Sequence, residues 1–296
     1  LEFQSNFSGK DGWLGADGAY SIPLSAKRSL WLFSDTLYGK SVPEGMSHNS
    51  LAIETEGKLE FSPAQKFTPP DGKGWYWVYD GQLQGSQDSQ HCQVFLGRFD
   101  VVPGGPEGLN FKFLDTWIAD LKIGQTAKEC EVEEYRRLSD LTPVPQSGDS
   151  AINFGAAICQ DEHFRYIYGT KDFGFHKELV VARVSSHLAP DLMHSDGQWE
   201  FYSQGGWQKP QENCPPPDSL QNSSGQPSQV SNELSVFFKD GLFHLVTQVG
   251  NEVQFLTSKT PEGPFSPSRT PQKIDEPAPG VMTYNAKAHP QNIDQQ

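Results

Sequence analysis

Residues 234–257, LSVFFKDGLFHLVTQVGNEVQFLT, contain three short runs of apolar and β-branched residues separated by two turn signals. The runs are 234–238, 242–247 and 253–257, and the turn signals are Lys239-Asp-Gly241 and Val249-Gly-Asn251. Runs of about four to six residues rich in β-branched and aromatic side chains, bounded by Gly, Asn or Asp, are typical of strands joined by tight hairpins. This segment therefore predicts an antiparallel meander.

The same pattern recurs along the chain in five groups of strand-like runs. They cover residues 13–60, 75–115, 153–203, 231–270 and 284–296. Recurring groups of short strands indicate propeller blades, even without a strict repeated motif. We predict an all-β fold, a five-bladed β-propeller made of a single domain over 1–296, with an incomplete last blade; a β-sandwich is the rival. For two connecting segments we expect a short surface helix at Cys130 to Leu138 and a mobile surface loop at 208–230.

Composition excludes several classes of protein. The 296 residues carry 23 basic and 37 acidic side chains, a net charge of −14, and the basic residues are scattered, which argues against nucleic acid as a partner. No apolar stretch is long enough for a membrane span. The four cysteines lie too far apart for a metal motif and leave open two disulfides or four thiols. No cofactor is expected.

Other features favour a protein that is secreted or located at the cell surface or in the periplasm. The sequons at Asn6 and Asn222 and the acidic composition point this way. The chain begins at Leu1 rather than Met, which is typical of a processed product.

Three acidic residues at the ends of strand-like runs are candidate catalytic residues. Asp17 lies in a Gly-rich segment, Asp35 directly continues the apolar run Leu30 to Phe33, and Glu233 precedes the strand at 234–238. Buried charges are expensive, so an acid that continues an apolar run needs a reason. The alternative is a turn or capping role, and for Asp17, followed by Gly18, a turn is the better explanation from the residues alone.

Polar and aromatic residues accompany these acids and are candidate substrate-binding groups. Aromatic rings beside carboxylates suit sugars, because rings stack on C–H faces while acids bind hydroxyls; core packing is the alternative for the rings and a structural hydrogen bond for His289. Lys287 and His289 occupy alternate positions, so in a strand they would share a face. The candidates are Asn49, Trp77, Asp80, Asn153, Lys287 and His289.

Several segments together resemble a known family. They are Trp13–Ser21, Leu30–Tyr38 with Asn49-Ser50, 258–265 and Tyr284–Pro290. They resemble the five-bladed propellers of domain-of-unknown-function family 4185, relatives of the glycoside hydrolase family 183 endo-D-arabinanases, although Ser34 replaces the usual Gly. The resemblance implies that Asp17 and Asp35 are the hydrolytic acids and that Glu233, Asn49, Lys287 and His289 surround the same cleft. Because that family continues past its His-Pro, a missing piece or a second polypeptide is expected to complete the last blade.

These observations predict a glycoside hydrolase for a furanose-containing, arabinan-like polysaccharide. Two carboxylic groups suffice for glycoside cleavage, and we expect an inverting mechanism with Asp17 as base and Asp35 as acid. Three alternatives remain. They are a non-catalytic carbohydrate-binding or adhesion propeller, a structural scaffold, and, ranked last, a Ca²⁺-dependent lyase or hydrolase.

Overall fold

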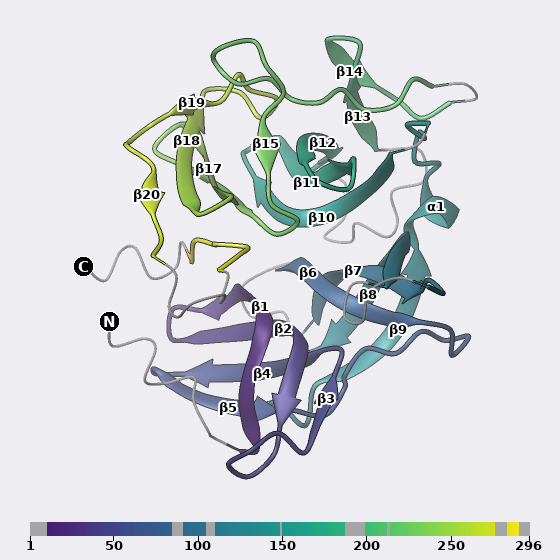
Figure 1. Cartoon of the computed structure of the whole chain (residues 1–296), viewed down its shortest axis with the longest axis vertical. Coiled ribbons are helices and arrows are strands. Elements are labelled where there is room, and N and C mark those ends of the chain that lie inside the picture. The colour runs from purple at the N-terminus through teal and green to yellow at the C-terminus, as the bar shows by residue number, and fades with distance from the viewer. Residues whose placement is uncertain are drawn as a thin grey trace. The chain divides into compact units, whose positions relative to one another are not determined.

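In the part of the chain that the structure describes, the strands form four antiparallel sheets, two in each of two compact units (Figure 1). The computed structural model describes residues 11–84, 91–104, 110–148, 150–186, 199–211, 214–275 and 283–289. The units are Leu1–Leu138 and Ser139–Gln296. Each sheet is a meander of the kind that makes a propeller blade, so the predicted all-β, β-propeller class is confirmed, with four blades. That a single domain spans 1–296 stays a prediction.

The first unit contains two sheets. The first sheet has the order β1 (Trp13–Ser25), β2 (Arg28–Tyr38), β4 (Ser50–Thr55) and β5 (Lys58–Ser62), and β3 (Gly45–Ser47) pairs with β2. The second sheet runs β6 (Trp75–Leu83), β7 (His91–Val101), β8 (Phe111–Lys122) and β9 (Glu131–Arg137). The short helix α1 (Leu138–Leu141) follows β9.

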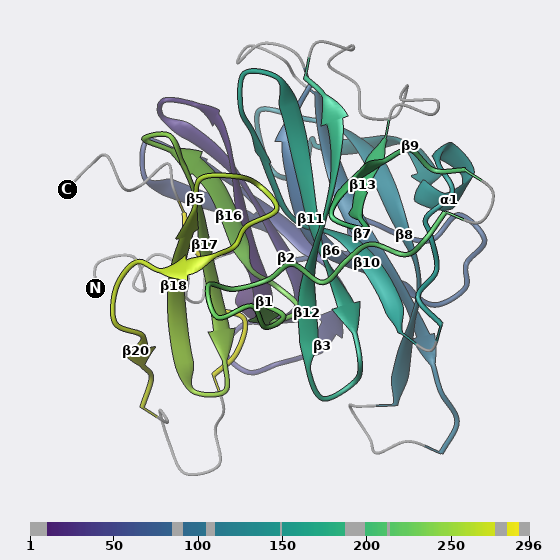
Figure 2. The same cartoon turned by 90° about the horizontal axis from the view of Figure 1, so that it is seen from above.

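The second unit contains the other two sheets. One has the order β10 (Ala151–Gln160), β11 (Phe164–Asp172), β12 (Lys177–Ser185), β13 (Glu200–Ser203) and β14 (Gly206–Gln208), with β15 (Gln229–Val230) on β12. The other runs β16 (Ser235–Lys239), β17 (Leu242–Val249), β18 (Glu252–Ser258) and β19 (Ser266–Pro267), with β20 (Gln272–Lys273) on β18. Figure 2 shows β17 and β18 side by side.

The predicted meander at 234–257 is confirmed as β16, β17 and β18. Its first turn has Asp240 at φ 53° and Gly241 at φ 75°. Two consecutive positive φ angles define the type I′ turn, whose twist matches that of the flanking strands. The meander contributes Val236, Leu245 and Leu256 to a core cluster that also includes Tyr166 and Tyr168 of β11. Burial of these apolar side chains holds the two sheets of the second unit together.

Two predictions about connecting segments are wrong. Residues 131–137 form strand β9 rather than a helix, because β8 supplies a hydrogen-bonding partner along its length. The segment 208–230 is anchored rather than mobile in its described part. The Leu220 backbone N–H donates to the Leu179 carbonyl at 2.8 Å, the Leu179 N–H donates to the Ser228 carbonyl at 3.0 Å, and the Leu220 side chain lies in the core.

The prediction of a fifth blade at 284–296 is also wrong. Residues 283–289 contain no strand, and 290–296 lie outside the described residues. Asn285 has φ 57°, which interrupts an extended strand. The segment instead docks on the fourth sheet, since the Ala288 N–H donates to Ser235 Oγ at 3.0 Å and Gln248 Nε2 donates to the Thr283 carbonyl at 2.8 Å. A second polypeptide that completes a blade is therefore not supported.

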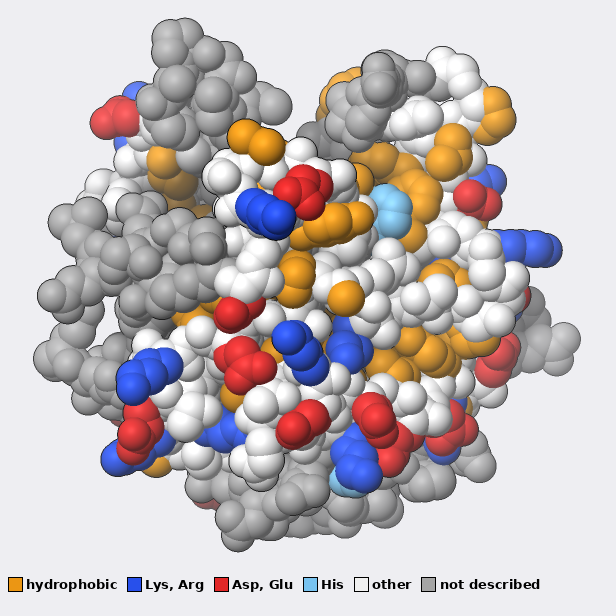
Figure 3. Space-filling view, turned by 90° about the horizontal axis from the view of Figure 1, so that it is seen from below, with side chains coloured by type: hydrophobic (Ala, Val, Ile, Leu, Met, Phe, Trp, Pro, Cys, Tyr) orange, Lys and Arg blue, Asp and Glu red, His pale blue; other side chains and the backbone are white. Residues whose placement is uncertain are grey.

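The distribution of basic side chains and the state of the cysteines can both be compared with what the composition predicted. On the face drawn in Figure 3, Lys and Arg side chains stand singly or beside acidic groups. All four cysteines, Cys92, Cys130, Cys159 and Cys214, are free thiols, which answers the question that their spacing left open. Within the described ranges, no helix has the length and apolar character needed to cross a bilayer.

Candidate functional site

The first candidate site is built around Asp35, in the middle of an irregular pair of strands. In β1 and β2, Ala16 pairs with Thr36 and Gly18 pairs with Phe33, so the single residue Asp17 faces both Ser34 and Asp35. Gly18 has φ 90°, and a Cβ there would lie 3.0 Å from the Ser34 backbone nitrogen, so the bulge requires glycine. Asp17 and Asp35 therefore both lie inside strands, and the turn explanation for Asp17 is wrong.

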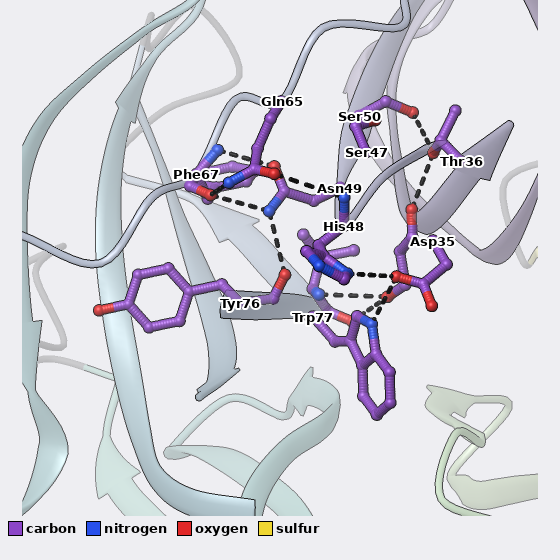
Figure 4. A network of polar contacts seen from close by, with 12 residues as sticks. Asp35, Thr36, Ser47, His48, Asn49, Ser50, Gln65, Phe67, Tyr76 and Trp77 are labelled. Carbon is purple, nitrogen blue, oxygen red and sulfur yellow. Dashed lines mark hydrogen bonds and ion pairs between the residues drawn. The ribbon is translucent and has the colours of Figure 1, made fainter. Parts of the chain in front are cut away.

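The carboxylate of Asp35 has one occupied and one open oxygen. Its Oδ1 accepts a hydrogen bond from Trp77 Nε1 at 2.8 Å and another from His48 Nδ1 at 2.9 Å. Its Oδ2 has no such bond in the part of the chain that the structure describes, as Figure 4 shows. The side chain is 25% exposed. Two nitrogen donors thus orient the carboxylate while one oxygen remains able to meet a ligand.

His48 is oriented by the same contact. A carboxylate only accepts hydrogen bonds, so the imidazole hydrogen lies on Nδ1 and leaves Nε2 as an acceptor, or as a second donor when the ring is protonated. The ring stacks on Trp75, with centroids 4.7 Å apart and planes at 18°. The imidazole is 34% exposed. Asp35 and His48 therefore present a carboxylate oxygen and an imidazole nitrogen on one accessible surface.

Aromatic rings from β6 border this pair. Trp75 and Trp77 are two positions apart on one strand and meet edge to face at 6.0 Å. The Trp77 ring packs on Phe99 at 4.3 Å and on Phe111 at 4.7 Å, so it is largely a packing residue that also donates to Asp35. From the sequence, Trp77 could be a substrate contact or a core residue. The structure shows its core packing, and its contact with a substrate stays a prediction.

Asn49 has a different place from the one expected. Its Nδ2 donates to the carbonyls of Phe67 and Tyr76 at 2.8 and 3.0 Å, and its Oδ1 accepts from the N–H groups of Lys66 and Phe67 at 2.9 and 2.7 Å (Figure 4). The side chain is fully buried. All its bonding positions are used by backbone, so the geometry makes Asn49 a clamp between the 66–67 segment and β6, next to His48.

Asp80 and Asn153, two further predicted substrate contacts, lie on β6 and β10. Asp80 lies in a bulge of β6 between the pairs Val78 with Leu96 and Gly81 with Val94, and its Oδ1 accepts from the Gly81 N–H at 2.8 Å. Asn153 is a buried residue of β10, in the second unit. Their roles in substrate binding stay predictions.

The second unit brings Glu233, Lys287 and His289 together. The Lys287 ammonium forms an ion pair with Glu233 Oε2, and their side chains are only 4% and 10% exposed. Burial, and then the positive charge of Lys287, lower the pKa of His289 to about 4, so this ring is neutral at neutral pH. The cluster joins segment 283–289 to the start of β16 and is a buried charge pair rather than an open acid.

The predicted site residues thus fall into two groups, and one important residue was missed. Asp17, Asp35, Asn49, Trp77 and Asp80 lie in the first unit. Glu233, Asn153, Lys287 and His289 lie in the second. His48 was missed, although a hairpin register that pairs Thr36 with Ser47 places it beside Asp35. Among the residues that the structure describes, no three His, Cys, Asp or Glu side chains are grouped to hold a metal ion.

Comparison with known families gives one clear match. A family model matches residues 1–296. The chain belongs to the family described as Domain of unknown function (DUF5005). The assignment to family 4185, which the motifs resembled, is therefore not supported. No curated protein sequence matches the chain significantly.

Solved structures share the fold. A Bacteroides ovatus ATCC 8483 protein, named provisionally as a hydrolase, aligns with TM-score 0.66 and 19% identity over 92% of this chain and 73% of its own. The α-L-arabinofuranosidase PaAbf62A of Podospora anserina, with cellotriose, gives 0.46 and 10% over 87% and 68%. Trypanosoma rangeli sialidase gives 0.47 and 12% over 86% and 38%. The first likeness shows the fold alone, and the other two, below 0.5, carry no argument about function.

Proposed function

We propose that this protein is a glycoside hydrolase that cleaves a furanose-containing, arabinan-like polysaccharide with inversion. The observation that carries the proposal is the carboxylate of Asp35, whose Oδ1 is fixed by His48 and Trp77 while Oδ2 is open. A carboxylate oriented by two nitrogen donors beside indole rings combines an open oxygen with surfaces that suit the C–H faces of a sugar.

Asp17 supplies the second carboxylate on the neighbouring strand. Inverting enzymes hold their two carboxyl groups roughly 6.5–9.5 Å apart, against about 5–5.5 Å in retaining enzymes. Residues directly opposite in an antiparallel pair have Cβ atoms about 4.5–5.5 Å apart. Because Asp17 faces two residues of β2 across a bulge, it is out of direct register with Asp35, which favours the wider spacing and so inversion. In this proposal Asp17 is the base that activates water. The proton for the leaving oxygen comes from the hydrogen-bonded pair of Asp35 and His48.

A second candidate is a non-catalytic carbohydrate-binding or adhesion protein. One observation favours it: Glu233, the third expected acid, is neutralised by Lys287. Asp35 would then only accept hydrogen bonds from sugar hydroxyls. This candidate predicts glycan affinity without product, whereas the hydrolase predicts both.

The experiment is a screen of arabinan, galactan and other furanose-rich glycans with detection of new reducing ends. Asp35→Asn should lose product formation and keep its thermal transition, while Asp100→Asn, at a partly exposed acid that accepts from the neighbouring Val101 N–H, should behave as wild type. Proton NMR of the first product should show the inverted anomer. Glycan binding with no reducing ends from the wild type would support the second candidate; unchanged turnover in Asp35→Asn would reject the site.

We also propose that the protein works outside the cytoplasm, secreted, in the periplasm or at the cell surface, where such polysaccharides occur. The acidic composition and the sequon at Asn222 support this, since Asn222 lies in the described surface turn before Gln226. Fractionation of producing cells tests it, and recovery only from the cytoplasm would reject it.

A further inference from the structure

We propose that His48 is the general acid of this site and that Asp35 is its positioning residue. The inference rests on the proposed glycoside hydrolase function and assigns the proton donor within it. His48 lies within hydrogen-bond distance of Asp35 and on an accessible surface, and no sequence motif pointed to it.

The first argument is the chemistry of the two side chains. A general acid must hold its proton at the working pH and release it in the transition state. Carboxyl groups ordinarily ionise near pH 4, whereas histidines ordinarily titrate near pH 6.5. At near-neutral pH an imidazole therefore exchanges a proton more readily than a carboxyl, unless the carboxyl environment is strongly altered. The imidazole of His48 is the group beside Asp35 that fits this requirement.

The second argument is orientation. The Nδ1–H of His48 is committed to Asp35, which turns Nε2, at the far end of the ring, away from the carboxylate. The stacked Trp75 ring fixes the plane of the imidazole, and the His48 backbone N–H bonds Gln65 Oε1 at 3.4 Å. An imidazole bonded through one nitrogen to a carboxylate is held in one tautomer, with its other nitrogen directed at the reacting atom.

The third argument is the charge around the ring. The described groups that contact His48 come from three elements: Asp35 on β2, Trp75 on β6, and Gln65 in the segment after β5. Of these, Asp35 alone is charged. Its carboxylate therefore balances the positive charge that the imidazole carries before it gives up its proton.

The proton balance is complete without another reactant. Nε2–H of the imidazolium gives its proton to the glycosidic oxygen, and the bond from that oxygen to the anomeric carbon breaks, with its electron pair left on the departing hydroxyl. Water attacks the anomeric carbon from the other side and gives a proton to Asp17. His48 ends neutral, Asp17 ends protonated, and exchange with solvent restores both for the next turnover.

The test compares substrates that differ in their need for an acid. The leaving group of a 2,4-dinitrophenyl arabinofuranoside departs as a stable dinitrophenolate anion and needs no proton. The leaving oxygen of an arabinan must be protonated. His48→Gln should lose at least about 100-fold in kcat on arabinan and change less than about 5-fold on the dinitrophenyl substrate. The matched control His244→Gln, a histidine of β17 in the second unit, should change neither rate.

The pH profile supplies a second readout that needs no variant. In the wild type, the ratio of arabinan rate to dinitrophenyl rate should fall as pH rises through the histidine range, about 5 to 8. In His48→Gln the ratio should no longer depend on pH over this range, because the proton donor is gone. A His48→Gln enzyme that keeps arabinan turnover within about 3-fold of the wild type, or a flat wild-type ratio, would overturn the inference. A wild type inactive on both substrates would overturn the proposed function instead.

Discussion

Asp35, inside β2, and Glu233, just before β16, are both predicted catalytic acids, but the two units give them different surroundings. Asp35, in the first unit, is 25% exposed and meets two nitrogen donors, an indole and an imidazole. Glu233, in the other unit, is 10% exposed and meets the ammonium group of Lys287. A nearly buried carboxylate needs a compensating charge, whereas a partly exposed one does not.

This difference separates a reactive acid from a structural one. The Glu233–Lys287 pair holds segment 283–289 against the fourth sheet, and the pair's charges cancel. Asp35 keeps an open oxygen and is bonded to no ammonium or guanidinium group among the described residues. The comparison therefore predicts that changes at Glu233 act on stability and that changes at Asp35 act on turnover.

The largest expected effect on stability comes from breaking the buried pair. Glu233→Gln should lower the free energy of unfolding by about 3–5 kcal/mol, because Lys287 remains buried without a partner charge. Asp35→Asn should change it by less than about 1 kcal/mol, since the amide oxygen still accepts hydrogen bonds. Urea unfolding measures both. The double variant Glu233→Gln/Lys287→Met should recover most of the loss, and equal losses at Asp35 and Glu233 would break the comparison.

Stability should also be sensitive to the loss of Asn49, the clamp beside the Asp35 site. Asn49→Ala leaves the buried N–H groups of Lys66 and Phe67 and the Tyr76 carbonyl without their partner, and should cost about 3 kcal/mol. Chemical denaturation of this variant beside Asn251→Ala, at an exposed turn, gives the measurement. A cost near zero would contradict the role of Asn49 as a clamp beside the Asp35 site.

Acid should weaken the second unit through His289. The folded pKa of this residue is lowered to about 4, while an unfolded chain binds the proton near pH 6.5. The unfolded state therefore takes up the proton first, and stability that is present above about pH 6.5 is lost as the pH falls toward 4, by up to about 3 kcal/mol. Unfolding midpoints across this range, with His289→Gln as the comparison, measure it; identical slopes in both proteins would contradict the burial of a neutral ring.

A small loss of stability is expected at Trp77. Trp77→Phe keeps a ring against Phe99 and Phe111 but removes the Nε1–H that donates to Asp35 Oδ1. One lost hydrogen bond to a partly exposed acceptor should cost about 1 kcal/mol. A loss above about 2 kcal/mol in urea unfolding would show that the indole hydrogen bond holds the first unit together, as the ion pair holds the second.

Local sequence was enough for much of the fold. The strands of the 234–257 meander, and the type I′ turn at Asp240-Gly241, follow from β-branched and aromatic runs bounded by residues that tolerate positive φ. The predicted helix at 130–138 failed because the strand character of β9 depends on β8, a partner about ten residues away in sequence. The fifth blade failed because residues 283–289 bond to side chains of the fourth sheet rather than to a neighbouring strand.

By itself, the sequence singled out Asp35 as a candidate, because an ionisable group that continues an apolar run needs an explanation. Only the tertiary structure decided what each acid does. His48 lies 13 positions from Asp35 and Lys287 lies 54 from Glu233, and it is strand register and docking that bring them into contact. Electrostatic and hydrogen-bond energies depend on distance in space and on burial, which a linear pattern does not contain. The same kind of residue therefore becomes an open acid in one unit and half of a buried ion pair in the other.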